Sequence, residues 1–294
     1  MKKSPLITLN NGTAIPALGL GVLDRPTRQL TAGAVEAAIA AGYRLIDTAA
    51  SYLNEREVGE GLRRSGIDRS EVFVTTKLWL SQYGYDSALR GFDASLRRLG
   101  LEYVNLYLLH WPLPSDFAAT SESYRAAERL LDEGHARAIG VSNFGPAHLK
   151  ALMERAQVVP AVNQVELHPF FIQKELRETH QRLGIVTQAW SPLGNSVRRA
   201  GTGGDPLTHP TVVQIATKYG KTPAQVVLRW HVQHGWAAIP KSFRPERIRE
   251  NFDIFDFALT DIDMASIDAL NTGNRFGPDP EVMTAGTLDM SLND

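Results

Sequence analysis

Short apolar runs that favour β-strand alternate with amphipathic helical segments along most of this 294-residue chain, and no other feature constrains its fold as strongly. Apolar residues fall on both faces of several runs, which is typical of parallel strands covered on both sides. The segments between the runs have the helical period, and in one of them Leu89, Phe92, Leu96 and Leu99 form a single apolar stripe. The predicted strands are 44–47, 72–77, 104–110, 138–142, 161–166, 185–190, 237–241 and 252–257.

Eight strand signals with intervening helices and no linker-like boundary favour a closed (β/α)8 TIM barrel, with residues 1–294 in one domain. An open doubly wound sheet is the alternative. Its usual mark is a G-x-G-x-x-G turn between a strand and a helix. Gly19-Leu20-Gly21 leads into no such helix, and Gly201-Thr202-Gly203-Gly204 follows no strand directly, so the barrel is favoured.

The two ends of the chain depart from the barrel pattern. Residues 6–9 and 14–17 flank the turn Asn10-Asn11-Gly12, which predicts an N-terminal β-hairpin. We expect this hairpin to close the barrel floor. Residues 273–294 show little periodicity and are predicted to be a loop or tail.

Composition says little about the fold, but it excludes several classes of function. A formal net charge of −1 gives no reason to expect nucleic acid or an anionic membrane as a partner. The absence of cysteine excludes disulfides and thiolate chemistry. The first apolar run, 6–9, is too short for a signal peptide or a membrane span, so we expect a cytoplasmic protein. We also expect a monomer.

Four polar residues, Asp47, Tyr52, Lys77 and His110, stand at or just after the ends of the first three predicted strands. Each one alone has an ordinary structural explanation, such as a helix cap or a half-buried aromatic ring. In a barrel, however, all four would share the rim where active sites form.

Together these four residues make a chemically sensible set. A tyrosine hydroxyl can give a proton to a carbonyl oxygen that gains charge, and a nearby lysine ammonium should lower the tyrosine pKa from about 10. An aspartate would hold the lysine in place, and a histidine could orient the carbonyl. No metal is expected, because no H-x-x-x-H or similar ligand spacing occurs. A barrel glycosidase is the rival hydrolase, but its carboxylate pair, Asp47 and Glu166, would lie across the barrel.

Seven segments, in order along the chain, resemble the aldo-keto reductase family. They are DTAASYLNE at 47–55, TTKLW at 75–79, LLHWP at 108–112, IGVSNF at 139–144, NQVELHP at 163–169, IPKS at 239–242 and RIRENF at 247–252. The resemblance implies a (β/α)8 barrel that binds NADPH without a Rossmann motif and reduces a small-molecule aldehyde or ketone, with Tyr52 as the acid. Some members of the family resemble regulatory or structural proteins without turnover, which is the second rival.

The resemblance also implies which residues meet the cofactor. Ser142, Asn143 and Gln164 would hold the nicotinamide carboxamide, and Trp190 would stack on the nicotinamide ring. The pyrophosphate would run along Ser191, Pro192, Leu193 and Gly194. Those that would meet the adenosine half are Lys241, Ser242, Phe243 and Arg247 near the 2′-phosphate, and Glu250 and Asn251 near the adenine. Tryptophan at 190 resembles the bacterial 2,5-diketo-D-gluconic acid reductases, whereas Phe243-Arg244 departs from the small residues common in the family.

The same resemblance places substrate walls at Val22, Trp79, His110 and Trp111, with the tail after Gly273. Trp79 and Trp111 indicate an apolar, aromatic mouth. The glycine-rich loop 194–206, which carries Arg198 and Arg199, is predicted either as a cover over the phosphates or as an ordinary surface loop.

Overall fold

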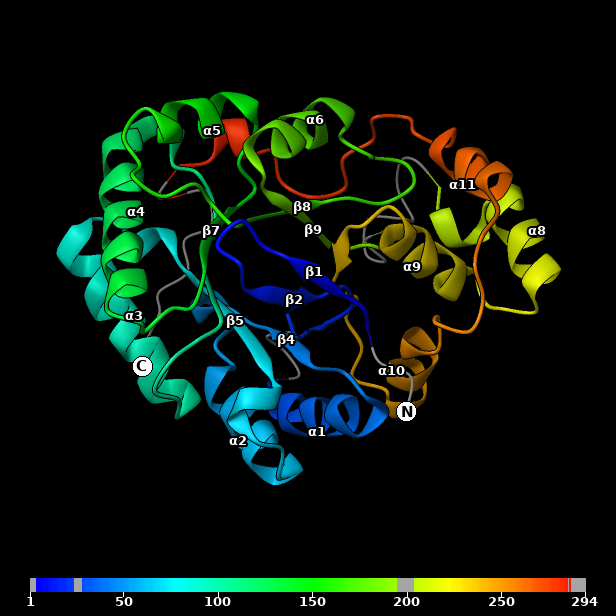
Figure 1. Ribbon diagram of the computed structural model, residues 1–294, viewed down its shortest axis with the longest axis horizontal. Coiled ribbons are helices and arrows are strands. Elements are labelled where there is room, and N and C mark those ends of the chain that lie inside the picture. Colours follow the sequence, from blue (N-terminus) through cyan, green and yellow to red (C-terminus); the bar gives the residue numbers. More distant parts are fainter. Residues whose placement is uncertain (1–3, 24–27, 195–203, 285, 287–294) are drawn as a thin grey trace.

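A computed structural model describes residues 4–23, 28–194, 204–284 and 286 of the chain. Eight parallel strands form one sheet in the order β10-β9-β8-β7-β6-β5-β4-β3, curled into a barrel with helices outside it (Figure 1). The strands are β3 (Leu20–Gly21), β4 (Leu45–Asp47), β5 (Phe73–Leu78), β6 (Leu106–Leu109), β7 (Ile139–Ser142), β8 (Val162–Glu166), β9 (Val186–Trp190) and β10 (Ala237–Ala238).

Contacts between the first and the last strand close the barrel. Leu18 bridges to Ala238 and Gly21 bridges to Lys241, both in parallel register. The backbone N–H of Gly21 donates to the carbonyl oxygen of Pro240 at 3.1 Å. A Cβ at Gly21 would lie 2.9 Å from the Ile239 carbonyl oxygen, so glycine is what allows this close approach.

The prediction of a strand at 252–257 is wrong. The eighth strand of the barrel is instead β3, near the N-terminus. Phe252 ends helix α10 (Pro245–Phe252), and the residues after it follow an irregular path. Phe252 and Ile254 are buried in the main hydrophobic core, whereas Asp253 between them is exposed, which gives the run a strand-like alternation. The sequence pattern missed β3 because two residues, one of them glycine, carry almost no strand signal. The four candidate residues therefore follow the second, third and fourth barrel strands, rather than the first three.

The helices agree with the predicted alternation. Phe92 and Leu99 of α3 are buried, and Leu89 and Leu96 pack partly against the same core, which confirms the predicted stripe. The helices are α1 (Thr31–Ala41), α2 (Glu55–Ser65), α3 (Tyr85–Leu99), α4 (Phe117–Asp132), α5 (Pro146–Met153), α6 (Lys174–Leu183), α8 (Pro210–Tyr219), α9 (Pro223–Gln233), α10 and α11 (Asp261–Asp268). Helices α8 and α11 lie outside α9 on one side (Figure 1), where Lys218 and Tyr219 of α8 both donate to Asp263. None of the helices in the described ranges has the length and apolar character that a membrane crossing requires.

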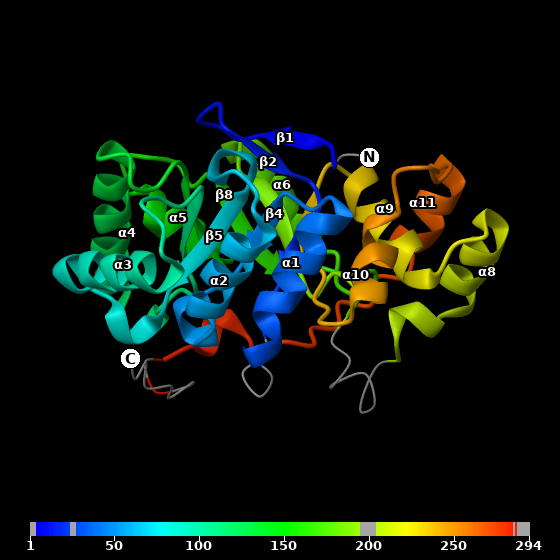
Figure 2. The same cartoon turned by 90° about the horizontal axis from the view of Figure 1, so that it is seen from below.

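The N-terminal hairpin closes the barrel floor, as predicted. Strands β1 (Leu6–Thr8) and β2 (Ala14–Pro16) pair antiparallel and lie across one end of the barrel (Figures 1 and 2). Leu9 and Ile15 of this segment are buried in one apolar cluster with barrel residues such as Leu45. The Asn11 side-chain amide donates to the Arg137 carbonyl oxygen at 2.9 Å, just ahead of β7. The opposite end, where the strands finish, is left open for a site.

Candidate active site

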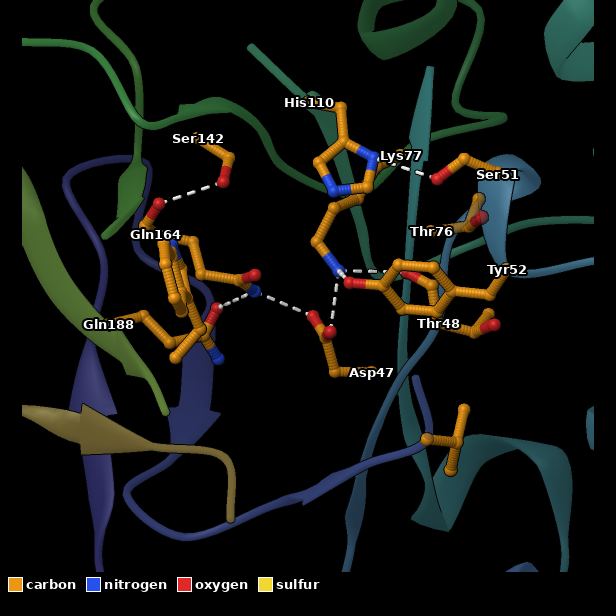
Figure 3. Close-up of polar contacts among 12 residues, drawn as sticks. Asp47, Thr48, Ser51, Tyr52, Thr76, Lys77, His110, Ser142, Gln164 and Gln188 are labelled. Atoms are coloured by element: carbon orange, nitrogen blue, oxygen red, sulfur yellow. Dashed lines mark hydrogen bonds and ion pairs between the residues drawn. The ribbon is translucent and has the colours of Figure 1, made fainter. Parts of the chain in front are cut away.

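Three of the four candidate residues converge on one ammonium group inside the barrel. Lys77 Nζ, on β5, donates to Asp47 Oδ1 at 2.5 Å and to the Thr48 carbonyl oxygen at 2.9 Å (Figure 3). It also lies 3.3 Å from the Tyr52 hydroxyl oxygen. Lys77 and Asp47 are 0% and 1% exposed, so this ion pair is shielded from water. Because buried charges need partners, the pair holds the lysine at one position beneath the tyrosine.

A short turn after β4 aims the tyrosine at that ammonium. Tyr52 ends a 3-10 helix (Ala50–Tyr52), and Leu53 follows it with a left-handed φ of 58°. Asn54, fully buried, fastens the turn: its Nδ2 donates to the Val22 carbonyl oxygen, and its Oδ1 accepts from Thr48 Oγ1, both at 2.8 Å. Asn54 was not predicted as a site residue, although it lies in the 47–55 segment.

Burial dominates the electrostatics of the tyrosine. It raises the pKa of the Tyr52 phenol above the ordinary value of 10.0, and the nearby Lys77 ammonium only partly offsets the rise. The predicted lowering of this pKa by Lys77 is confirmed, but burial outweighs it, so the net shift is upward. Burial lowers the pKa of Lys77, but Asp47 and Tyr52 raise it more, which keeps the ammonium protonated.

His110 stands beside the tyrosine as a neutral imidazole. Burial, with a smaller contribution from the Lys77 charge, holds its pKa well below the ordinary 6.5. Its ring centroid lies 5.6 Å from that of Tyr52 and 5.1 Å from that of Trp79, both edge-on. His110 Nδ1 lies 3.3 Å from Ser51 Oγ. A neutral imidazole with a fixed ring can orient a carbonyl oxygen without exchanging protons with it.

One continuous cavity of about 1340 Å³ opens over these residues. Lys77 lies behind the cavity wall, and Tyr52, Asp47 and His110 line one part of it. The other predicted site residues all line the same cavity: Val22, Trp79, Trp111, Ser142, Asn143, Gln164, Trp190, Ser191, Pro192, Leu193, Gly194, Lys241, Ser242, Phe243, Arg247, Glu250 and Asn251. The cavity is thus long enough to reach from the tyrosine to the cations near α10.

Amide and hydroxyl side chains form the wall next to Asp47. Asn143, with a left-handed φ of 65°, donates through Nδ2 to the His110 carbonyl oxygen and to Ser142 Oγ. Its Oδ1 accepts from the indole N–H of Trp190 at 2.8 Å. Gln164 Nε2 donates to Asp47 Oδ2 at 2.6 Å. These hydrogen bonds hold the side-chain amides of Asn143 and Gln164 at fixed positions in the cavity wall, which suits a primary amide such as the nicotinamide carboxamide.

The far end of the cavity carries cations at a helix start. Lys241 follows β10, and Arg247 lies in the first turn of α10, whose N-cap residue, Arg244, makes no side-chain cap bond. Backbone N–H groups and the helix dipole favour an anion there. Glu250 is held in place because its Oε1 accepts from Thr222 Oγ1 at 2.8 Å.

Glu166, considered above only as a glycosidase carboxylate, fastens the C-terminal segment instead. Its carboxylate is fully buried and accepts from the backbone N–H groups of Phe276 at 2.6 Å and Gly277 at 2.8 Å, and its Oε1 lies 3.0 Å from His168 Nε2. A Cβ at Gly277 would lie 2.3 Å from the Trp190 ring. Both carboxylate oxygens are engaged, so the hydrolase alternative loses its second acid.

The predicted tail therefore has a defined course as far as residue 284. After Gly277 it lines the cavity with Pro278, and Met283 packs into a cluster with Trp79 and Trp111. This apolar cluster agrees with the predicted aromatic mouth. Most of the loop predicted as a phosphate cover, including Arg198 and Arg199, lies outside the described residues. Within the described ranges, no group of three potential metal ligands comes together.

Comparison with known proteins agrees with this geometry. The chain matches the aldo/keto reductase family over residues 12–272. It is 56% identical to a morphine 6-dehydrogenase from Pseudomonas putida over 283 residues, 95% of each chain. It is 46% identical to a glyoxal reductase from Bacillus subtilis (strain 168), across 94% of this chain and 96% of the relative. A solved Bombyx mori aldo-keto reductase in complex with NADP has a TM-score of 0.86 and 37% identity, over 94% of this chain and 95% of that one.

The chain belongs to the aldo/keto reductase family. It is an NADPH-dependent oxidoreductase that transfers a hydride to an aldehyde or ketone and gives an alcohol, as predicted from the sequence.

Proposed function

We propose that Tyr52 is the general acid of this carbonyl reductase, with Lys77, Asp47 and His110 as its partners. The observation that carries the proposal is the placement of the Tyr52 hydroxyl, 3.3 Å from a buried ammonium that is itself paired with a buried carboxylate. Tyr52 and His110 face the cavity, whereas Lys77 lies behind it. Only Tyr52 among the three therefore combines a transferable proton with access to a substrate at neutral pH.

The proton moves in a defined direction. NADPH, when bound, supplies the hydride. As the carbonyl oxygen gains negative charge, the Tyr52 hydroxyl gives it a proton, and the Lys77 ammonium stabilises the phenolate that remains. Asp47 keeps the ammonium in place, and the neutral His110 imidazole donates a hydrogen bond that orients the carbonyl oxygen.

The cofactor would lie along the rest of the cavity, with Gln164, Asn143 and Ser142 holding the carboxamide and Trp190 stacking on the nicotinamide ring. The pyrophosphate would pass residues 191–194. Lys241, Ser242, Phe243 and Arg247 would meet the 2′-phosphate, and Glu250 and Asn251 the adenine. The fit is supported by the cavity's length, by the cations at the start of α10 and by the Gln164 oxygen, for which the described part of the chain offers no donor.

The substrate class is a carbonyl compound with an apolar or aromatic substituent. Trp79, Trp111 and Met283 support this choice, and one of the relatives is named for morphine, a large and largely apolar compound. Trp190 alone supports the subgroup of 2,5-diketo-D-gluconic acid reductases. A single-domain monomer in the cytoplasm stays a prediction.

A pH profile of carbonyl reduction tests the proposal. The acid form of Tyr52 is the donor, so kcat/KM should be constant below the Tyr52 pKa and fall only above it. Since that pKa is raised above 10.0, and that of His110 lies well below 6.5, the profile should be flat from about pH 6.5 to about pH 9. Initial rates of NADPH oxidation, measured across this pH range, give the profile. The substrate class is tested by the same assay with an aromatic α-ketoaldehyde and with a keto sugar, and the aromatic compound should have the higher kcat/KM. A change in kcat/KM across pH 6.5 would contradict the assignment of His110 as a neutral imidazole. A higher kcat/KM for the keto sugar would contradict the proposed substrate class.

Cofactor choice gives a second test. NADH lacks the 2′-phosphate, so Lys241 and Arg247 gain nothing from it. Charge-assisted contacts are worth roughly 1.5–3 kcal/mol each, and two such contacts on exposed side chains should favour NADPH on the order of a hundredfold. The double change Lys241→Gly with Arg247→His should remove most of this preference, mainly by weakening NADPH. The measurement is the ratio of kcat/KM for the two cofactors.

The matched control for that pair is Arg249→His, which alters a cation of the same helix that does not line the cavity. It should leave the ratio unchanged. Equal use of NADH and NADPH by the unchanged protein would refute the assignment of both cations, and added salt should weaken the preference.

A further inference from the structure

Gln188 is a buried residue beneath the candidate site that neither the sequence reasoning nor the proposed mechanism uses. It lies on β9 directly beside Gln164 of β8, in parallel register, so that both side chains point into the barrel. Gln188 is 0% exposed and does not line the cavity, whereas Gln164 does. Gln188 therefore cannot meet a ligand itself and can act only through its neighbour.

The Asp47 charge fixes how both amides are turned. The carboxylate oxygen Oδ2 can only accept, so Gln164 must present its amide nitrogen to it, at 2.6 Å. The second N–H of the same nitrogen donates to Gln188 Oε1 at 2.8 Å (Figure 3). With both N–H bonds used, Gln164 has only its oxygen left for the cavity. Among the described residues, no donor is found for that oxygen.

The orientation of the Gln188 amide leaves its own nitrogen without a hydrogen bond. Its own Nε2 is buried and has no hydrogen-bond acceptor among the described residues. An unpaired buried donor is unfavourable, and turning the Gln188 amide over would instead set two nitrogens against each other. The arrangement is thus the one in which Gln164 is held at two points, by Asp47 and by Gln188.

We propose that Gln188 is a positioning residue that locks the Gln164 amide with its oxygen toward the nicotinamide head, and so makes the site select a carboxamide N–H. The proposal rests on the proposed cofactor placement. Without Gln188 the Gln164 amide keeps one contact, to Asp47, and can turn about it, so its oxygen no longer has a fixed position. A head group that carries a carbonyl but no N–H leaves the Gln164 oxygen unpaired in the unchanged protein.

Binding of two oxidised cofactors tests this, because binding does not depend on their different reducing power. The ligands are NADP⁺ and its 3-acetylpyridine analogue, in which a methyl ketone replaces the carboxamide. Dissociation constants are measured by titration calorimetry. The unchanged protein should bind NADP⁺ about tenfold more tightly than the analogue, since one buried acceptor goes unpaired with the analogue. Gln188→Met, which keeps the length of the side chain and removes the acceptor, should reduce this ratio to about threefold or less, through weaker NADP⁺ binding.

Thr187→Val is the matched control. Thr187 is the preceding residue of β9, faces away from the barrel interior and lies 2.8 Å from His180 Nδ1, so its replacement also removes one buried hydrogen bond from the strand. It should keep the tenfold ratio. Gln188→Leu serves as a second variant should Gln188→Met fold poorly, and it should give the same reduced ratio.

A double-mutant cycle shows whether Gln188 acts through Gln164. Gln164→Met should lower the ratio, and adding Gln188→Met to it should lower the ratio no further. A ratio that stays near tenfold in both Gln188 variants, or one that falls further in the double variant, would overturn the proposal. Failure of the unchanged protein to bind NADP⁺ would instead overturn the cofactor placement, so the two failures are distinguishable.

Discussion

Replacing Lys77 with methionine should abolish most of the carbonyl reduction and destabilise the fold at the same time. Lys77 makes three contacts, with Asp47, Thr48 and Tyr52, and its own side chain is fully buried. Without the ammonium, the phenolate formed by proton donation has no stabilising charge, and kcat should fall by about two orders of magnitude or more. The Asp47 carboxylate is left buried without a partner charge, which should lower the free energy of unfolding by about 3–5 kcal/mol.

A double variant separates the two effects. Lys77→Met with Asp47→Asn removes both charges, while the asparagine oxygen can still accept from Gln164 Nε2. We expect urea unfolding to show that most of the stability lost by the single variant returns in the double variant. Turnover should remain low in both, because neither has the ammonium. A single variant as stable as the unchanged protein would show that the ion pair is not the buried, compensating pair described above.

The architecture could be predicted where the residues carry a strong local signal. Seven of the predicted strands overlap barrel strands, because most of those strands contain apolar or β-branched residues at neighbouring positions. The strand β3 could not be found in this way, since Leu20–Gly21 is held by the approach of its glycine to Ile239, far away in sequence. The run 252–257 has the sequence pattern of a strand because Phe252 and Ile254 are both buried in the core, with the exposed Asp253 between them.

The candidate site could be predicted for a different reason. In a barrel all strands end at one face, so Tyr52, Lys77 and His110 share that face whatever the details of the helices. Residues that act by holding others were missed. Glu166 bonds to the Phe276 and Gly277 amides, and Gln188 bonds to Gln164; both contacts depend on barrel register or on a distant tail. The lowering of the Tyr52 pKa by Lys77 could be predicted, but the larger rise caused by burial could not, because the extent of burial at this position is not encoded in any local pattern.

Removing the hydroxyl oxygen of Tyr52 should lower turnover about as much as Lys77→Met does, but it should hardly change the stability of the fold. Tyr52→Phe keeps the ring that packs beside His110 and above Lys77, and it removes the hydroxyl that lies 3.3 Å from Lys77 Nζ. The ion pair between Lys77 and Asp47 remains, so stability should change little. A carbonyl oxygen that gains charge would have no acid within reach, since His110 is neutral and Lys77 lies behind the cavity wall.

The most direct measurement is the rate of NADPH oxidation in a single turnover, followed by absorbance with enzyme in excess, for the unchanged protein and for Tyr52→Phe. Binding of NADP⁺ to the same two samples is the control, and the two dissociation constants should agree within about twofold, because the proposed mechanism has the hydroxyl contact the substrate and not the cofactor. If Tyr52 is the proton donor, the rate should fall by about a hundredfold or more while cofactor binding is retained. A Tyr52→Phe rate close to that of the unchanged protein, with NADP⁺ bound equally well, would contradict the account.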